Sequence, residues 1–488
     1  MKDLRTWLMA MILLLAGLPS AHASDEIAVA RHQGTFNGVA LAYTSRVEHN
    51  RISDGSTADG KDGPSADVVS IAYMADVADA AQRPVIFVFN GGPISPSIYL
   101  HMGAFGPKRV AFPDDLAADP ETFALVDNPY TVLDVADVVL FDPTGTGYSR
   151  VADGTAPNAY FSVEADARQL VQMIETWSRR HGRLDSPKYL LGESYGTLRA
   201  ARAARLMSER AQPLRVDGVF LLGQALNIIE MAQRPGNVTS YVVSLTTLAS
   251  LGWYHGKVEP RGRRFEDFLD EVRQFAEGDY LTALFQGGNL PDAEKRRIAA
   301  RLEALTGLPA QVHLAHDLKV TKDQYRVELL RGQGLVLGGY DARYVGTPEA
   351  PGQLVDASMA PWRRISDTFN AYARDVLRMP AGLAYVTQSP VGSLEGWDWA
   401  PGKSPFADWP YMRDLNIAME RQPGLEVIVA AGYYDTATTI GASEYAIAQS
   451  GWPRDRVRML YYQGGHMPYT IESSLKQFTD DVRAWMRR

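Results

Sequence analysis

Short apolar runs, separated by turn residues, recur along the chain and predict seven β-strands. They span residues 68–73, 85–89, 138–141, 189–191, 219–222, 425–430 and 457–461. Most of these runs are apolar at nearly every position, which is expected of parallel strands that are buried on both faces. Between two of them, residues 162–180 carry apolar side chains at the spacing of an amphipathic helix. The alternation of strands and helices predicts a doubly wound, mostly parallel α/β sheet.

Residues 228–375 interrupt this alternation, because strand-like runs are few there and helical patterns dominate. Two apolar helix faces stand out, formed by Phe265, Phe268, Leu269, Val272 and Phe275 and by Ile298, Leu302 and Leu305. Strand patterns resume at Leu425, so the segment is interpreted as an inserted, mainly helical cap over the active edge of the sheet. The core then comprises residues 24–227 and 376–488, and a separate domain at 228–375 is the alternative.

The first 23 residues have the features of a signal peptide. Lys2 and Arg5 precede an apolar stretch that is too short to span a bilayer comfortably. Ala21-His22-Ala23 then gives the small-x-small pattern of a signal-peptidase site. We expect cleavage after Ala23, and an uncleaved membrane anchor is the alternative. No second long apolar run follows, so no membrane association is expected after cleavage.

Composition narrows the classes of function. The 488 residues carry a formal net charge of −8, which argues against a nucleic-acid partner. The sequence has no cysteine, so disulfides, thiolate metal sites and cysteine nucleophiles are excluded. A signal peptide without cysteines suits a bacterial periplasmic or secreted protein. Nothing in the sequence indicates a metal or an organic cofactor.

A glycine-flanked serine follows the apolar run at residues 189–191. In Gly192-Glu193-Ser194-Tyr195-Gly196 the serine lies where a strand would break into a sharp turn, and the glycines on either side avoid the collisions that larger side chains would cause there. Such a turn exposes the hydroxyl to a histidine on one side and to a substrate carbonyl on the other. Because serine alone is a poor nucleophile, this interpretation requires a base, an acid and oxyanion donors elsewhere in the chain.

An acid and a histidine follow two later predicted strands. Asp435 comes shortly after the run at 425–430, and His466 follows Gly464 and Gly465 after the run at 457–461. The two glycines allow a tight loop that can bring the imidazole back toward Ser194. The chain order Ser194, Asp435, His466 is that of the α/β-hydrolase catalytic triad, in which each member comes after a strand.

Two backbone N–H donors are needed to stabilise the oxyanion that forms when the serine attacks. One candidate is Tyr195, the residue after the serine. The other is Gly92, in the segment Asn90-Gly91-Gly92-Pro93 after the run at 85–89. An ordinary turn would use the same residue types, but beside the triad the oxyanion interpretation is favoured.

These segments resemble the signature blocks of the serine carboxypeptidase family. The similar segments are residues 90–93, 192–196 and 465–467, together with 128–130 and 142–149. They fall within about residues 85–225 and 425–470, and the predicted cap carries no family motif. The resemblance implies an α/β-hydrolase fold and a peptidase that removes C-terminal residues from peptides through an acyl-enzyme.

The resemblance also implies how the terminal carboxylate of a peptide is held. In the family an asparagine, an adjacent backbone N–H and two glutamic acids hold it, and Asn90, Gly91 and Glu193 match three of these four positions. A carboxyl group beside a bound carboxylate must be protonated to donate a hydrogen bond, so activity is expected to be favoured in acid. The fourth position falls on Ala104, so one carboxyl partner is missing.

Three functions follow from these patterns, in order of preference. The first is a serine carboxypeptidase-like hydrolase with peptide substrates. The second is an esterase or an acyltransferase, because family relatives with the same triad include both and the alanine at position 104 weakens the case for a strict carboxypeptidase. The third is a catalytically silent binding protein, which the complete triad disfavours. Lys108 or Arg109 could hold the carboxylate instead, although exposed basic residues are the more ordinary interpretation.

Overall fold

The computed structural model describes residues 25–54, 63–399 and 408–487, so the predicted signal peptide lies outside the described residues. At its centre is a sheet with the strand order β1 (Glu26–Phe36), β2 (Val39–Ser53), β3 (Ser65–Ala75), β7 (Asp137–Phe141), β4 (Val85–Phe89), β9 (Lys188–Glu193), β10 (Gly218–Leu222), β13 (Glu426–Gly432) and β14 (Val457–Tyr462). The short β8 (Arg150–Val151) pairs with β3. From β7 to β14 all neighbouring strands are parallel. The strands predicted from the apolar runs are all confirmed.

The first three strands differ from the sequence-based expectation. β3 is antiparallel to both of its neighbours, and β1 pairs antiparallel with β2. Because β3 is buried along nearly its whole length, it has the same continuous apolar pattern as a parallel strand. The pattern therefore identified this strand but not its direction. The sequence does not predict β1 or β2, because β1 is largely exposed or half-buried and β2 has polar residues at several buried positions, among them Ser45, Glu48 and Asn50.

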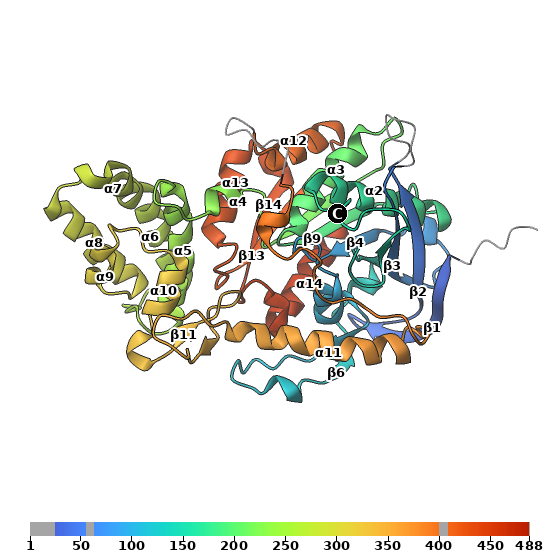
Figure 1. Cartoon of the computed structure of the whole chain (residues 1–488), viewed down its shortest axis with the longest axis horizontal. Helices are drawn as coiled ribbons and strands as arrows, with labels where there is room; N and C mark the ends of the chain where they lie inside the picture. The colour runs from blue at the N-terminus through green and yellow to red at the C-terminus, as the bar shows by residue number, and fades with distance from the viewer. Residues whose placement is uncertain (1–24, 55–62, 400–407, 488) are drawn as a thin grey trace, which may run out of the picture.

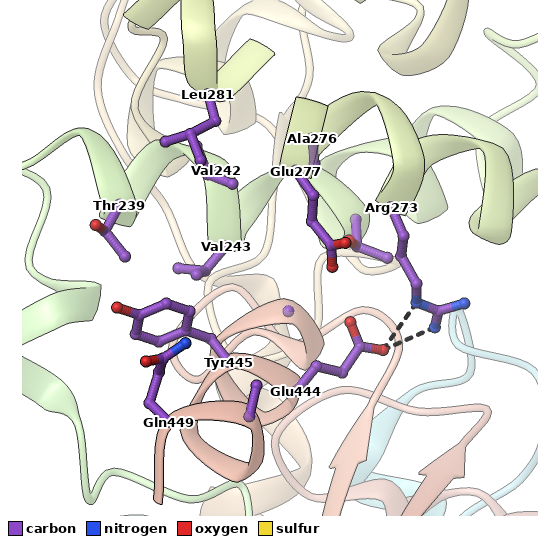
Figure 2. A pocket seen from close by; sticks show the side chains of 13 residues that line it. Thr239, Val242, Val243, Arg273, Ala276, Glu277, Leu281, Glu444, Tyr445 and Gln449 are labelled. Atoms are coloured by element: carbon purple, nitrogen blue, oxygen red, sulfur yellow. Dashed lines mark hydrogen bonds and ion pairs between the residues drawn. The ribbon is translucent and has the colours of Figure 1, made fainter. Parts of the chain in front are cut away.

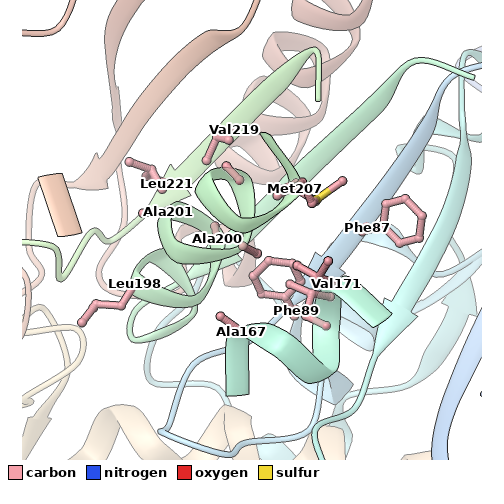
Figure 3. Close-up of a cluster of buried hydrophobic side chains, with 14 of the residues drawn as sticks. Phe87, Phe89, Ala167, Val171, Leu198, Ala200, Ala201, Met207, Val219 and Leu221 are labelled. Atoms are coloured by element: carbon pink, nitrogen blue, oxygen red, sulfur yellow. The ribbon is translucent and has the colours of Figure 1, made fainter. Parts of the chain in front are cut away.

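Alternate residues of each strand face opposite sides of the sheet, because strands have a side-chain period of two. In β4, Phe87 and Phe89 belong to one hydrophobic cluster, and Ile86 and Val88 belong to the other. The first cluster is covered by α2 (Val163–Arg180), α3 (Gly196–Glu209) and α12 (Tyr411–Arg421), and the second by α11 (Ala360–Asp375) and α14 (Glu472–Met486). Figure 3 shows side chains of α2 and α3 together with Phe87 and Phe89 of β4 in the first cluster. The doubly wound arrangement and the helix predicted at 162–180 are thereby confirmed.

A group of helices stands apart from the sheet at one end of the molecule (Figure 1). It contains α5 (Val238–Tyr254), α6 (Phe265–Phe275), α7 (Leu281–Gln286), α8 (Asp292–Thr306), α9 (Ala310–Ala315) and α10 (Lys322–Glu328). The apolar faces predicted at 265–275 and 298–305 pack together in one cluster. By contrast, α11 contributes Ile365 and Phe369 to the second sheet cluster. The division of the chain at 228 and 375 stays a prediction.

Smaller elements connect these layers: α1 (Ile98–Leu100), α4 (Ile228–Met231), β5 (Lys108–Val110), β6 (Leu125–Asp127), β11 (Val336–Leu337) and β12 (Val345–Gly346). Within the residues that the structure describes, no helix is long and apolar enough to cross a membrane.

The helical group contacts the core through α5 and α13 (Ile440–Ser450). These two helices approach closely, since a Cβ at Gly441 would lie 2.4 Å from the carbonyl oxygen of Val243. A cavity of about 470 Å³ opens beside this contact, between α5, α6, α7 and α13 (Figure 2). On its wall Arg273 pairs with Glu444 at 2.8 Å, which joins the helical group to the core. Because α13 begins shortly after Asp435, the contact between α5 and α13 lies close to the predicted triad in the sequence.

Candidate active site

The chain turns sharply between β9 and α3, and Ser194 lies at this turn. Its φ is 59°, in the left-handed region that residues other than glycine rarely adopt. The Ser194 N–H donates to the carbonyl oxygen of Leu222 at 2.9 Å, which fixes the turn against β10. A Cβ at Gly192 would lie 2.2 Å from the carbonyl oxygen of Gly196, so only glycine fits there. Ser194 stays partly exposed, as a nucleophile must.

The loop after β4 packs directly on this turn. A Cβ at Gly91 would lie 2.6 Å from the backbone nitrogen of Tyr195 and 2.7 Å from the carbonyl oxygen of Glu193. Gly92, the next residue in the loop, is exposed and has a φ of 107°, which favours glycine. Tyr195 immediately precedes α3, so its N–H lies at the positive end of a helix dipole. The predicted oxyanion donors therefore lie on adjoining backbone segments beside Ser194.

A buried hydrogen-bonded pair joins Asp435 and His466. The Oδ2 atom of Asp435 lies 2.7 Å from Nδ1 of His466. Its Oδ1 accepts hydrogen bonds from the N–H groups of Ala437 and Thr438, at 2.7 and 3.0 Å. The hydroxyl of Thr438 also donates to Oδ2, at 2.5 Å. The carboxylate is thus oriented by its own loop and engages Nδ1, which leaves Nε2 as the nitrogen for proton transfer.

The basicity of His466 reflects two opposing effects. Burial is the largest single effect and lowers the pKa of its imidazole, but the charge of Asp435 and the hydrogen bond that the ring donates to this carboxylate oppose it. The charge of Glu193 adds to the increase, and the resulting pKa lies above the ordinary value of histidine. A more basic imidazole accepts the proton of a serine hydroxyl more readily, as a general base requires.

Glu193, next to the serine, is a buried carboxyl group with two hydrogen-bond donors. Asn90 Nδ2 donates to its Oε1 at 2.8 Å, and the hydroxyl of Tyr469 donates to its Oε2 at 2.6 Å. Asn90 is held in turn by the N–H of Leu100, which donates to Oδ1 at 3.0 Å. Burial raises the pKa of Glu193 to about 7, although the charge of His466 and the two hydrogen bonds act in the opposite direction. Below that pH the carboxyl group is mainly neutral.

Tyr469 lies close to the position where the resemblance implies a second glutamic acid. Ala104 occupies that position, and its carbonyl oxygen accepts a hydrogen bond from Asn128 Nδ2 at 2.7 Å. A Cβ at the neighbouring Gly103 would lie 2.6 Å from the ring of Tyr469. The Tyr469 hydroxyl therefore gives Glu193 a partner that residue 104 does not supply. The sequence analysis missed this residue, and its place shortly after His466 was the only signal.

Lys108 and Arg109, considered above as replacements for the missing carboxyl group, pair with other carboxylates. Lys108 Nζ on β5 lies 2.6 Å from the exposed Asp127 on the antiparallel strand β6. The nearly buried Arg109 pairs with Glu472 at 2.9 Å, and its guanidinium lies 5.5 Å from the centre of the Tyr130 ring. Both basic side chains are thus already engaged in the structure.

Arg199 on α3 ties the helix to the loop after β4, and the sequence analysis missed it too. The side chain is fully buried and its Nε donates to Oδ2 of Asp166 at 2.7 Å. A terminal nitrogen donates to the carbonyl oxygen of Asn90, also at 2.7 Å. The guanidinium lies 5.4 Å from the centre of the Phe89 ring. An arginine among the small residues of the helix after the serine was the available signal.

Fold and site together define an α/β-hydrolase, with a serine on a strand–turn–helix elbow and an acid and a histidine after later strands. Residues 72–224 match the family model described as serine carboxypeptidase, peptidase family S10. This match confirms the resemblance noted from the motifs, and the protein is accordingly a serine hydrolase. The matched segment contains Ser194 and both oxyanion candidates, whereas Asp435 and His466 lie beyond it.

Several solved structures align with most of the chain. Proline iminopeptidase from Mycobacterium smegmatis is 14% identical, and the alignment covers 94% of this chain and 98% of that chain with a TM-score of 0.35. A lipase in its open form is also 14% identical, with 91% and 98% covered and a TM-score of 0.35. A thermostable carboxyl esterase from Bacillus coagulans is 13% identical, with 90% and 98% covered and a TM-score of 0.37. Similarity of this degree does not identify a substrate. No curated protein matched the chain.

Proposed function

We propose that the protein is a serine carboxypeptidase-like hydrolase that removes C-terminal residues from peptides. Ser194 attacks the scissile carbonyl carbon while His466 accepts the serine proton, and Asp435 stabilises the imidazolium. The N–H groups of Gly92 and Tyr195 stabilise the oxyanion. His466 then gives the proton to the leaving amine, and water hydrolyses the acyl-enzyme by the same route. As the predicted signal peptide implies, we place the enzyme in the bacterial periplasm or in the medium.

The observation that carries this proposal is the buried carboxyl group of Glu193 next to the nucleophile. When neutral, Glu193 can donate a hydrogen bond to a peptide's terminal carboxylate, together with Asn90 and the N–H of Gly91. When ionised, it repels that carboxylate. Because burial raises the pKa of Glu193 to about 7, the neutral form prevails in acid. Recognition of the terminal carboxylate is therefore favoured below pH 7, and the advantage of free-acid peptides declines as Glu193 ionises.

Two peptides that differ only at the C-terminus test this proposal. We expect benzoylglycyl-phenylalanine to be cleaved faster than its C-terminal amide below pH 7. The ratio of its kcat/KM to that of the amide should also fall as the pH rises through about 7, because Glu193 then loses its proton. Deprotonation of His466 affects both peptides alike and cancels in this ratio, whereas the amide presents no carboxylate to Glu193. Equal rates for the two peptides across this range would contradict the carboxypeptidase proposal and leave the triad intact.

The identity of the nucleophile has a separate test. A fluorophosphonate reagent should label the wild-type protein covalently and should not label the Ser194→Ala variant. Absence of labelling in the wild type would favour the catalytically silent binding protein. Labelling of Ser194→Ala at the same rate would mean that another residue is the nucleophile.

An esterase or acyltransferase is the second candidate, and one observation favours it. Both oxygens of Glu193 already accept hydrogen bonds from Asn90 and Tyr469, and position 104 offers no second carboxyl group. A substrate carboxylate would have to replace one of these bonds. This candidate predicts hydrolysis of simple benzoylglycine esters without any advantage for a free-acid peptide over its amide.

A further inference from the structure

We propose that Tyr99, Trp362 and Tyr340 form a binding surface for an aromatic group on the leaving-group side of the scissile bond. We call these three side chains the aromatic row. The inference rests on the proposed function, because it takes Ser194 as the nucleophile and His466 as the proton donor to the leaving group. It adds the class of substrate: one whose leaving group carries an aromatic ring.

The row consists of three rings in sequence, and it begins at His466. The ring centres of Tyr340 and His466 are 5.3 Å apart, those of Tyr340 and Trp362 are 4.5 Å apart, and those of Tyr99 and Trp362 are 5.2 Å apart. These separations lie in the range of attractive aromatic contacts. All three residues of the row stay partly exposed, whereas His466 is buried. The row thus presents aromatic surface to solvent next to the catalytic histidine.

The backbone under Tyr340 is fixed to the loops of both Asp435 and His466. The Tyr340 carbonyl oxygen accepts a hydrogen bond from the His466 N–H at 2.6 Å. Next to it, Asp341 Oδ2 accepts a hydrogen bond from the N–H of Gly465 at 3.0 Å. The N–H of Ala342 donates to the carbonyl oxygen of Tyr434 at 3.0 Å. Tyr340 therefore keeps its place relative to the reacting atoms, as a specificity residue must.

The residues next to the aromatic row indicate that it lies on the leaving-group side of the scissile bond. His466 gives its proton to the leaving group, so the leaving group lies next to the ring that Tyr340 contacts. Burial raises the pKa of Tyr99 and of Tyr340, and the charge of Glu193 contributes to both increases. Tyr99 lies near Glu193 as well, because the N–H of the next residue, Leu100, donates to Asn90 Oδ1 and Asn90 donates to Glu193. This is the side where the proposed function binds a terminal carboxylate. A side chain on the terminal residue would meet the row.

The class of the group follows from the chemistry of the row. Its three side chains are aromatic. Aromatic rings attract one another in stacked or edge-to-face geometries, and this attraction adds to the free energy gained when apolar area is buried. A cationic side chain could also bind the faces of these rings, and it is treated as a competing outcome. Tyr99 lies within the matched family segment, whereas Tyr340 and Trp362 lie outside it, so these two members of the row do not follow from the match.

Esters of one acyl group test the row without requiring a terminal carboxylate. We expect wild-type kcat/KM for benzoylglycine benzyl ester to exceed that for the ethyl ester by about tenfold or more. The variants Tyr340→Leu and Trp362→Leu should each lower this ratio several-fold, whereas Tyr340→Phe should preserve it. The ratio is independent of the fraction of protein that folds. Phe285→Leu is a matched control, since Phe285 is an exposed aromatic residue on α7, and it should leave the ratio unchanged.

Each other outcome overturns a specific step. Equal rates for the benzyl and ethyl esters would reject the aromatic row, even where the free-acid preference and covalent labelling uphold the proposed function. An unchanged benzyl-to-ethyl ratio in both Tyr340→Leu and Trp362→Leu would show that the row does not contact the leaving group. Faster cleavage of benzoylglycyl-arginine than of benzoylglycyl-phenylalanine would replace the aromatic ligand with a cationic one. Absence of any ester or peptide cleavage, with no labelling of Ser194, would overturn the proposed function itself.

Discussion

Two parts of the molecule meet at the site, and they are built in different ways. In the core, the loop after β4 and the turn at Ser194 are so close that a Cβ at Gly91 would overlap the backbone of Tyr195. In the segment that carries Tyr340, the backbone is tied to the catalytic loops, while the ring remains partly exposed. The difference indicates that backbone packing fixes the reaction geometry, whereas partly exposed side chains such as that of Tyr340 are available to contact a substrate. Substitutions in the core should therefore lower the reaction rate, whereas substitutions around Tyr340 should change the substrate preference.

The largest effect is expected where the two parts join, at His466. The substitution His466→Ala removes the imidazole but keeps the N–H that donates to the carbonyl oxygen of Tyr340. We expect kcat/KM for benzoylglycine ethyl ester to fall by at least about 10⁴-fold, because the residues of a triad act as a unit. His32→Gln, on the exposed edge strand β1, is the control and should retain wild-type activity. Near-normal turnover by His466→Ala would show that another group is the base.

A smaller but still large loss is expected from Gly91→Ala in the core. The added Cβ would lie 2.6 Å from the backbone nitrogen of Tyr195, so the loop must move away from the turn. Displacing an oxyanion donor lowers kcat by about 10²–10³-fold in related chemistry, and we expect a loss of that order with the fold retained. The control is Gly236→Ala, where a Cβ meets nothing within 4 Å. Wild-type kcat in Gly91→Ala would show that the close packing is not needed for the reaction.

The parts of the site that the sequence predicts are those with a local signal. Ser194, Asp435 and His466 each follow an apolar run, and glycines mark the close approaches around them. Tyr469 and Arg199 have no such signal, because their roles arise from contacts between distant segments. Tyr469 meets Glu193 across 276 residues of sequence, and Arg199 meets Asn90 across 109. For the same reason the apolar run in β3 revealed a strand but not the direction of its neighbours.

Tyr469→Phe should have a moderate effect, visible mainly in the pH profile. The hydroxyl of Tyr469 donates to Glu193 Oε2 at 2.6 Å and so favours the ionised carboxylate. Without this bond the pKa of Glu193 rises, and the neutral form persists to higher pH. The fall in the ratio of kcat/KM for a free-acid peptide to that for its amide should then move upward by roughly one pH unit. An unchanged profile with lower activity throughout would mean that Tyr469 has only a packing role.

The smallest effect on catalysis is expected inside the helical group. The buried hydroxyl of Tyr325 lies 2.8 Å from the carbonyl oxygen of Leu248 and 2.7 Å from that of Thr306, so it joins α10 to α5 and α8. Tyr325→Phe should lower the free energy of unfolding by about 1–2 kcal/mol, because buried carbonyl groups lose a donor. The urea midpoint measures this change, and Tyr254→Phe, at an exposed position on α5, should not move it. The benzyl-to-ethyl ester ratio should stay at its wild-type value in both variants. A changed ratio in Tyr325→Phe would show that the interior of the helical group, and not only the aromatic row, controls recognition.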